Sequence, residues 1–385
     1  ADWCSVSISE DDGTVNQLAV AHVDPAKVEM AKALAERYPP DPDSPYGVHA
    51  VLRTGKSQLI QEIPESLLEA AAQNEEHLQL IKGLNLKSAM SVPMIARGKA
   101  LGVISFVSAE SGHLYDESDL ELAEDLARRA AVAVDNARLF EERSYVARTL
   151  QQSLLPPKLP SVPGVELSSL YRPAGEAFEV GGDFYDVFPS RGSSWAVVIG
   201  DVCGKGPDAA SVTGLARHTI RAAAVEESKP SRILQALNEA VIQQRTDHTF
   251  CTVAYVRAKR ASEGVALDVC CAGHPLPMIL RADGAVEAVG AEGTLLGIFP
   301  DPELSDRSGK LGPGDALVLY TDGLTDQPGP EGRLGRKGIE EVLSSAVGMD
   351  AASISACLER AVMNGSGQAL QDDVALLVLR VLPSN

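Results

Sequence analysis

Acidic residues stand where several apolar runs begin or end in the second half of the chain. They are Asp201 after the run 195–199, Asp322 after the run 316–320, and Asp372 with Asp373 before the run 374–381. Short runs rich in Val, Leu and Ile and bounded by Gly or Asp are typical of buried β-strands. An ionised carboxylate there costs several kcal/mol to desolvate unless a cation meets it. No Lys or Arg is conspicuously placed to pair with all of these acids, so the sequence favours a hard divalent cation, Mg²⁺ or Mn²⁺.

Five motifs contain these acids or lie between them. They are GGDFYD at 181–186, GDVCGKG at 200–206, CAGHP at 271–275, TDGLTD at 321–326 and QDDVALLV at 371–378. In this order they resemble the metal-dependent protein phosphatases (PPM or PP2C type), specifically their bacterial SpoIIE/RsbU-like branch. The resemblance extends from about residue 152 to residue 382. It implies an αββα sandwich over 156–385 that hydrolyses phosphoserine and phosphothreonine, and the alternation of predicted strands and helices there agrees with that architecture.

The resemblance also implies two Mn²⁺ or Mg²⁺ ions and assigns their ligands. The catalytic and metal-binding residues are Asp201 as the bridge, the backbone carbonyl of Val202, Asp183 on the second ion, and Asp322 and Asp372 on the first, with Asp373 as the alternative to Asp372. Two ions a few ångströms apart neutralise the phosphoryl oxygens and acidify a water molecule that attacks phosphorus directly.

For two of these metal ligands, a nearby aspartate is an alternative. Asp183 and Asp186 are three residues apart, so on an extended strand they point to opposite faces and cannot both bind metal. We favour Asp183, because it follows the Gly-Gly corner. The same alternation separates Asp372 from Asp373, and there we favour Asp372.

The group that protonates the departing oxygen stays open. In the eukaryotic branch a histidine follows the bridging aspartate by two residues, whereas this chain has Cys203, a poor acid for that role. His274 has either a structural role in a turn or a catalytic one. Lys205 either attracts the substrate phosphate or caps its loop.

Residues 1–140 predict a mixed α/β unit. Strand-like runs at 3–8 and 17–22, helical periodicity at 25–38 and 75–83, and a hairpin of 89–95 with 100–108 follow one another. This order, and the stretch 88–140 above all, resembles a GAF sensor domain, an antiparallel sheet with helices. The first helix that is usual in GAF domains would precede Ala1. Nothing in the sequence identifies a GAF ligand.

One long helix is predicted over 119–155, ending at Pro156-Pro157. Residues at intervals of seven, with small or polar residues between them, permit a seam between two helices. They are Leu126, Ala133, Phe140, Ala147 and Leu154, with Ala130, Ala137, Ser144 and Gln151 between them. The seam predicts a homodimer contact through this connecting helix. The alternative is a last GAF helix that packs on its own domain.

The net charge and the cysteine content indicate which binding partners and which cellular compartment to expect for this protein. The 385 residues include 34 Lys and Arg and 53 Asp and Glu, a formal charge of −19, which argues against binding to nucleic acid or anionic membranes. No apolar run is long enough to span a bilayer. Six cysteines without disulfide-like spacing predict free thiols in the cytoplasm.

Together these patterns predict a GAF-regulated phosphatase in bacterial stress or developmental signalling. By resemblance, its substrate is a phosphorylated anti-anti-sigma factor of the STAS fold, and the reaction leads to release of a sigma factor. The alternatives are a non-catalytic ligand-sensing scaffold and a hydrolase of small phosphoesters. Because Asp183, Asp201, Asp322 and Asp372 are all present, catalysis is favoured over the scaffold.

Overall fold

A computed structural model describes residues 1–10, 12–174, 180–244, 249–329, 332–365, 370 and 372–383. Gln371 of the fifth motif lies outside the described residues. The chain divides into two compact units, Ala1–Glu142 and Arg143–Asn385. All six cysteines are free thiols, as predicted. None of the helices in the described part of the chain combines the length and the apolar character needed to cross a bilayer.

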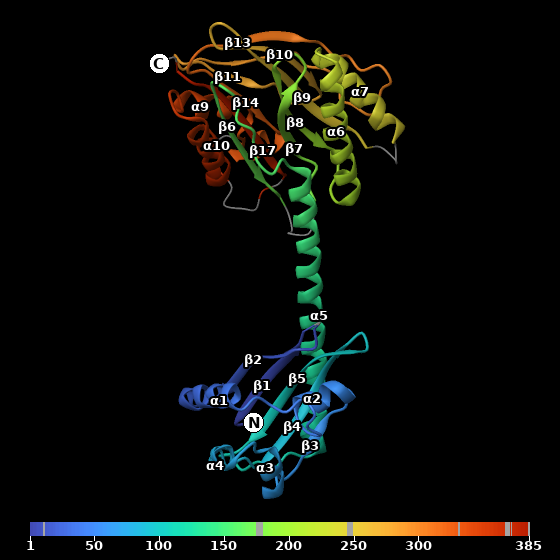
Figure 1. The fold of residues 1–385 in the computed structure, drawn as a ribbon, viewed down its shortest axis with the longest axis vertical. Helices are drawn as coiled ribbons and strands as arrows, with labels where there is room; N and C mark the ends of the chain where they lie inside the picture. The colour runs from blue at the N-terminus through green and yellow to red at the C-terminus, as the bar shows by residue number, and fades with distance from the viewer. Residues whose placement is uncertain are drawn as a thin grey trace. The chain divides into compact units, whose positions relative to one another are not determined.

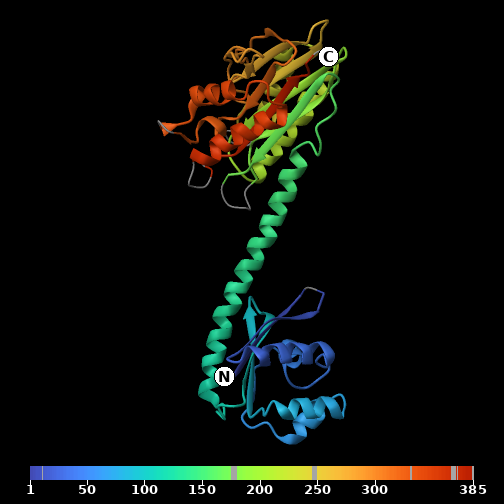
Figure 2. The same ribbon diagram turned by 90° about the vertical axis from the view of Figure 1, so that its left-hand side faces the viewer.

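The first unit is built on a five-stranded antiparallel sheet in the order β2-β1-β5-β4-β3. Its elements are β1 (Trp3–Ser9), β2 (Val15–His22), α1 (Pro25–Arg37), α2 (Val48–Thr54), β3 (Gln58–Ile60), α3 (Glu65–Ala71), α4 (Glu75–Gly83), β4 (Ser88–Ala96) and β5 (Lys99–Ser108). Figure 2 shows α1, α3 and α4 on the face of the sheet opposite to α5 (Glu117–Leu154). The predicted strands, hairpin and two helices are confirmed, whereas the short elements α2, β3 and α3 were not predicted.

Helix α5 is a single helix of 38 residues, which confirms the predicted connecting helix. In the first unit Ala123, Ala127 and Ala131, one turn apart, pack on the sheet with Val92. The side chain of Leu126, in the predicted seam, is 50% exposed. The beginning of α5 therefore packs on its own domain and leaves part of the predicted seam on the surface.

The second unit contains two five-stranded sheets, ordered β13-β10-β9-β8-β7 and β12-β11-β14-β17-β6. The first sheet comprises β7 (Phe184–Ser190), β8 (Ser194–Val202), β9 (Cys251–Arg260), β10 (Val265–Ala272) and β13 (Arg307–Leu311). The second comprises β6 (Val165–Arg172), β11 (Met278–Leu280), β12 (Val286–Ala288), β14 (Ala316–Tyr320) and β17 (Val374–Val381). A small pair, β15 (Pro328–Gly329) and β16 (Gly332–Arg333), and the short helix α8 (Asp322–Thr325) follow β14.

Helices cover both outer faces of this sandwich (Figure 1). Helices α6 (Pro207–Glu226) and α7 (Pro230–Gln243) pack on the first sheet, and α9 (Gly335–Ser345) and α10 (Ala351–Gly365) pack on the second. Between the two sheets, apolar side chains that include Val197, Val256 and Leu377 form a separate core. The predicted αββα architecture is confirmed, and the helices of the second face, α9 and α10, were not individually predicted.

The motif-bearing ends of the strands lie at one end of the sandwich. The register pairs Phe184 with Gly200, Asp201 with Thr252, and Tyr320 with Leu376. Because neighbouring strands are antiparallel, the beginning of β7 meets the end of β8, and the end of β14 meets the beginning of β17. Acids that are up to 190 residues apart in sequence are thereby brought to one edge of the two sheets.

Candidate metal centre

Acidic side chains from both sheets converge at this end of the sandwich. Asp183 precedes β7, Asp201 lies near the end of β8, Asp322 begins α8, and Asp372 and Asp373 precede β17. Asp183 and Asp373 are buried, at 2% and 5% exposure. The sheet register thus places each of the acids that the sequence singled out in the same region.

Thr321 joins the two sheets beneath these acids. Its hydroxyl donates to Oδ2 of Asp183 at 2.7 Å and accepts from the Ala375 N–H at 2.9 Å. The side chain of Thr321 is fully buried. The sequence reasoning missed this residue, although its place immediately before Asp322 could have drawn attention to it.

Glycines allow the loops to approach closely. A Cβ atom on Gly182 would lie 2.0 Å from the Val202 carbonyl oxygen and 2.7 Å from Oδ1 of Asp201. A Cβ atom on Gly181 would lie 1.4 Å from Oδ2 of Asp373. These separations are far below van der Waals contact, so only glycine fits at both positions.

The acids repel one another, and Asp183 and Asp373 are shielded from water. Burial, followed by the charge of Asp201, raises the pKa of Asp183 well above its ordinary value, against the lowering effect of the Thr321 hydrogen bond. Burial, followed by the charges of Asp322 and Asp372, raises the pKa of Asp201 to about 7. Burial is also the largest cause of the raised pKa values of Asp322 and Asp373. Such a cluster is stabilised in its charged form when a cation joins it.

The donor set matches a hard divalent cation. The contributing groups are carboxylate and carbonyl oxygens, the ligands that Mg²⁺ and Mn²⁺ prefer. Among the described residues, the cation closest to these acids is the ammonium of Lys205, whose Nζ lies 3.8 Å from Oδ1 of Asp372. Its single positive charge is too small to balance the whole cluster. Within the described ranges no three His, Cys, Asp or Glu side chains form a ligand group as they stand.

Asp372 and Asp373 have different surroundings. The Asp373 carboxylate accepts hydrogen bonds from the Ala174 N–H at 2.7 Å and the Tyr171 hydroxyl at 3.0 Å. The Asp372 side chain is 54% exposed, faces Lys205, and contributes to the raised pKa of Asp201. The oxygens of Asp373 are already hydrogen-bonded within the fold, so the carboxylate of Asp372 is the more accessible of the two.

Asp186 serves the packing of α6. Its buried carboxylate accepts from Arg221 at 2.7 and 2.8 Å and from Arg217 at 3.1 and 3.3 Å. A carboxylate held by two guanidinium groups has little remaining capacity for a metal ion. Of the pair in GGDFYD, Asp183 is therefore the available ligand.

His274 links strands behind the acids. Its Nε2 lies 3.1 Å from the Tyr320 carbonyl and its Nδ1 2.8 Å from the Thr252 hydroxyl. A carbonyl only accepts, so Nε2 carries the proton and Nδ1 accepts from Thr252. Burial lowers the pKa of His274 to about 3, so the ring is neutral. His274 supports the loop before Asp322 from within and has the structural role rather than that of an exposed acid.

Cys203 and Lys205 lie on the exposed loop after Asp201. Partial burial, followed by the negative charge of Asp201, raises the pKa of the Cys203 thiol. The thiol therefore keeps its proton, in agreement with its expected weakness as an acid.

Two family profiles match the chain. The profile of stage II sporulation protein E (SpoIIE) matches residues 191–382, and the profile of the GAF domain matches residues 1–134. The chain joins a GAF domain to a SpoIIE-type phosphatase domain. Both resemblances read from the motifs are thereby confirmed.

Two curated relatives match part of the chain at low identity. The chain is 26% identical to protein IcfG of Synechocystis over 258 residues, which are 60% of this chain and 40% of IcfG. It is 27% identical to the phosphoserine phosphatase RsbU of Bacillus subtilis over 236 residues, 61% of this chain and 69% of RsbU. The match therefore spans less than half of IcfG and about two thirds of RsbU.

A solved structure supports the fold. The SiaA-PP2C domain of Pseudomonas aeruginosa matches with a TM-score of 0.55 and 21% identity, covering 64% of this chain and 99% of that domain. At this identity the likeness shows the architecture of the phosphatase domain.

The raised pKa of Asp201 makes the stability of the phosphatase domain depend on pH. Because this pKa is about 7 in the folded chain against an ordinary 3.8, the folded state binds more protons than the unfolded state between these values. The free energy of unfolding should therefore fall as the pH rises from about 4 to about 7. A divalent cation replaces the proton, so the increase in melting temperature caused by Mn²⁺ should be larger at about pH 8 than at about pH 6.

Differential scanning fluorimetry with and without Mn²⁺ measures this dependence. The Asp201→Asn variant is the control, because its amide does not titrate and its Mn²⁺ effect should be smaller. An equal Mn²⁺ effect at both pH values in the unmodified chain would contradict the assignment of the acids.

Proposed function

We propose that this chain is a metal-dependent phosphatase of phosphoserine and phosphothreonine in proteins, with two Mn²⁺ or Mg²⁺ ions. The supporting observation is the convergence of acids with raised pKa values at one end of a SpoIIE-type domain. When bound, such ions neutralise charge on the phosphoryl group and activate water for attack.

The residues of this chain would have separate duties in that reaction. Asp201 would hold both ions, Asp183 the second, and Asp322 and Asp372 the first, with the Val202 carbonyl as a further donor. Asp373 would keep Tyr171 and the preceding loop in place through its hydrogen bonds. Lys205, which is near Asp372, would attract the negative phosphate into the site.

For the substrate we propose a phosphorylated STAS-domain protein. The similarity to RsbU, which is named a phosphoserine phosphatase, supports a protein substrate over a small phosphoester. The test is phosphate release from a phosphorylated STAS protein of the same organism, compared with p-nitrophenyl phosphate at equal concentration. A higher kcat/KM for the phosphoprotein supports the proposal, whereas a preference for the small ester would favour the alternative hydrolase. Absence of Mn²⁺-dependent activity on both would favour the scaffold.

The end of α5 contacts the metal-site loop within the second unit. Gln151 Oε1 accepts from the Gly181 N–H at 2.7 Å, two residues before Asp183. Ala147 packs on Val180 and on Ala210 of α6. We therefore propose that the GAF domain regulates the site through α5, because a rotation of this helix would displace the corner that carries Asp183.

Replacing Gln151 with Ala should weaken Mn²⁺ binding. The buried Gly181 N–H would lose its acceptor, at a cost of about 1–3 kcal/mol, and the loop would lose its fixed position. Gln152→Ala is the control, because it removes the same type of side chain from an exposed position on the same helix. Isothermal titration with Mn²⁺ measures both variants. Equal Mn²⁺ affinities for the two would argue against control through this contact.

A homodimer through α5 is part of the same proposal. Leu122 and Leu126, one turn apart on α5, are 71% and 50% exposed in the first unit. Burial of these two leucines in a second copy would pair the first part of α5, where Leu126 belongs to the predicted seam, whereas the seam residues Ala147 and Gln151 are already buried in their own chain. Sedimentation of the full chain and of a Leu122→Glu, Leu126→Glu variant tests this, since a monomer in both cases would exclude the contact.

A further inference from the structure

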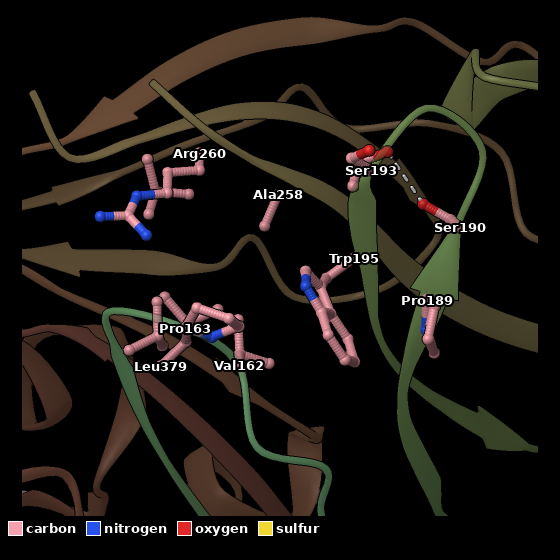
Figure 3. Close-up of a pocket in the computed structure, with 12 residues that line it drawn as sticks. Val162, Pro163, Pro189, Ser190, Ser193, Trp195, Ala258, Arg260 and Leu379 are labelled. Atoms are coloured by element: carbon pink, nitrogen blue, oxygen red, sulfur yellow. Dashed lines mark hydrogen bonds between the residues drawn. The ribbon is translucent and has the colours of Figure 1, made fainter. Parts of the chain in front are cut away.

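The space between the two sheets of the phosphatase domain is incompletely filled at the end remote from the acids. A cavity of about 410 Å³ opens there. Its apolar wall consists of Val162, Pro163, Trp195, Ala258 and Leu379 (Figure 3). Val162 and Pro163 come from the segment between α5 and β6, and the others come from both sheets. The volume lies within the range of about 300–1,000 Å³ that is typical of small-molecule sites.

Strand alternation directs an arginine to this space. On β9, Ala254, Val256 and Ala258 point into the core between the sheets. Arg260 continues this row by two residues and also lines the cavity. Its neighbour Lys259 belongs to the opposite face of the strand. The row therefore ends on an exposed guanidinium-bearing residue at the edge of the cavity.

The guanidinium group of Arg260 makes no hydrogen bond or ion pair with the residues that the structure describes, although its backbone pairs with Val265. On the same strand Arg257 pairs with Asp268, at 3.4 Å. The chain has 53 acidic residues, so an unpaired arginine beside an apolar cavity is notable in this protein. Its charge complements an anion, and its planar group suits a carboxylate.

We propose that this cavity binds a small aromatic carboxylate. The aromatic body packs against the indole of Trp195 and the aliphatic wall, and the carboxylate pairs with Arg260. Strand β8 runs from Ser194 at the cavity to Val202 at the acids, and Val202 is seven steps along the strand from Trp195, a distance of about 23 Å. The ligand therefore does not touch the acidic cluster, and its binding can be measured without metal.

Trp195 provides a direct readout. The chain has two tryptophans, so Trp3→Phe leaves Trp195 as the single indole. The probe is 8-anilinonaphthalene-1-sulfonate, an aromatic anion that accepts energy from a nearby indole, added to the full chain in EDTA. Saturable transfer is expected, and 2-naphthoate should displace the probe at least about tenfold more effectively than the uncharged 2-naphthylmethanol.

Two variants in the same background separate this site from general probe binding. Arg260→Gln should weaken the competition by 2-naphthoate about tenfold, whereas Lys259→Gln, which removes the same charge one residue earlier, should leave it unchanged. Ala258→Leu, which fills the cavity, should abolish transfer if its melting curve stays cooperative. Absence of saturable transfer in the Trp3→Phe chain, equal competition by the acid and the alcohol, or equal behaviour of the Arg260 and Lys259 variants would each overturn the proposal.

Discussion

Replacing Asp201 with Asn should abolish most of the Mn²⁺-dependent hydrolysis of p-nitrophenyl phosphate. Asp201 has the most central place among the acids, because Asp322, Asp372 and Asp373 all raise its pKa. An amide keeps the shape of the side chain but removes the charge that would hold two cations together. The loss should exceed the roughly 10- to 100-fold effect that is typical for residues that only orient metal ligands.

Asp208→Asn is the matched control. Asp208 is exposed in the first turn of α6, seven residues after Asp201, and the same charge is removed there. Its activity should remain close to that of the unmodified chain. If Asp201→Asn keeps full activity, or if a chelator has no effect on the unmodified chain, the two-metal account is wrong.

Gly182→Ala should disrupt the metal site through shape alone. The new Cβ would lie 2.0 Å from the Val202 carbonyl, a group expected to bind metal, and 2.7 Å from Oδ1 of Asp201. Because the atoms met first are backbone, the two loops must move apart. Overpacking of this kind costs about 1–3 kcal/mol or more. We expect a lower melting temperature and a large loss of Mn²⁺ affinity, measured by calorimetric titration.

Gly214→Ala separates this effect from the general consequences of adding a methyl group. Gly214 lies within α6, and its added Cβ would come no closer than 3.8 Å to Leu154. Alanine also has a higher helix propensity than glycine, so this variant should be as stable as the unmodified chain or more so. Normal Mn²⁺ binding by Gly182→Ala would mean that the close approach of the loops is not needed for the site.

The positions of the acids could be predicted from the sequence because each stands at the end of an apolar strand. Antiparallel pairing then brings strand ends together, as it does for Asp201 at the end of β8 and Asp373 before β17. The sequence could not show that Asp373 is engaged by Tyr171 and Ala174, about 200 residues away, because such contacts depend on how the loops pack. For this reason the sequence alone could not show how differently Asp372 and Asp373 are surrounded.

The connecting helix α5 shows a different limit of prediction from sequence. The length of this helix could be predicted from the uninterrupted periodicity up to Pro156. The face that packs on the GAF sheet could not be predicted. That face consists of alanines such as Ala123 and Ala127, which are less apolar than the leucines elsewhere on the helix. The larger residues at intervals of seven, such as Leu126, therefore dominated the pattern although the structure leaves Leu126 half exposed.

Anomalous diffraction from crystals grown in MnCl₂ tests the central claim most directly. The account predicts two manganese peaks about 3.5–4 Å apart, with Asp201 between them and Asp183, Asp322 and Asp372 around them. A cluster without manganese, or manganese bound only elsewhere on the chain, would contradict it.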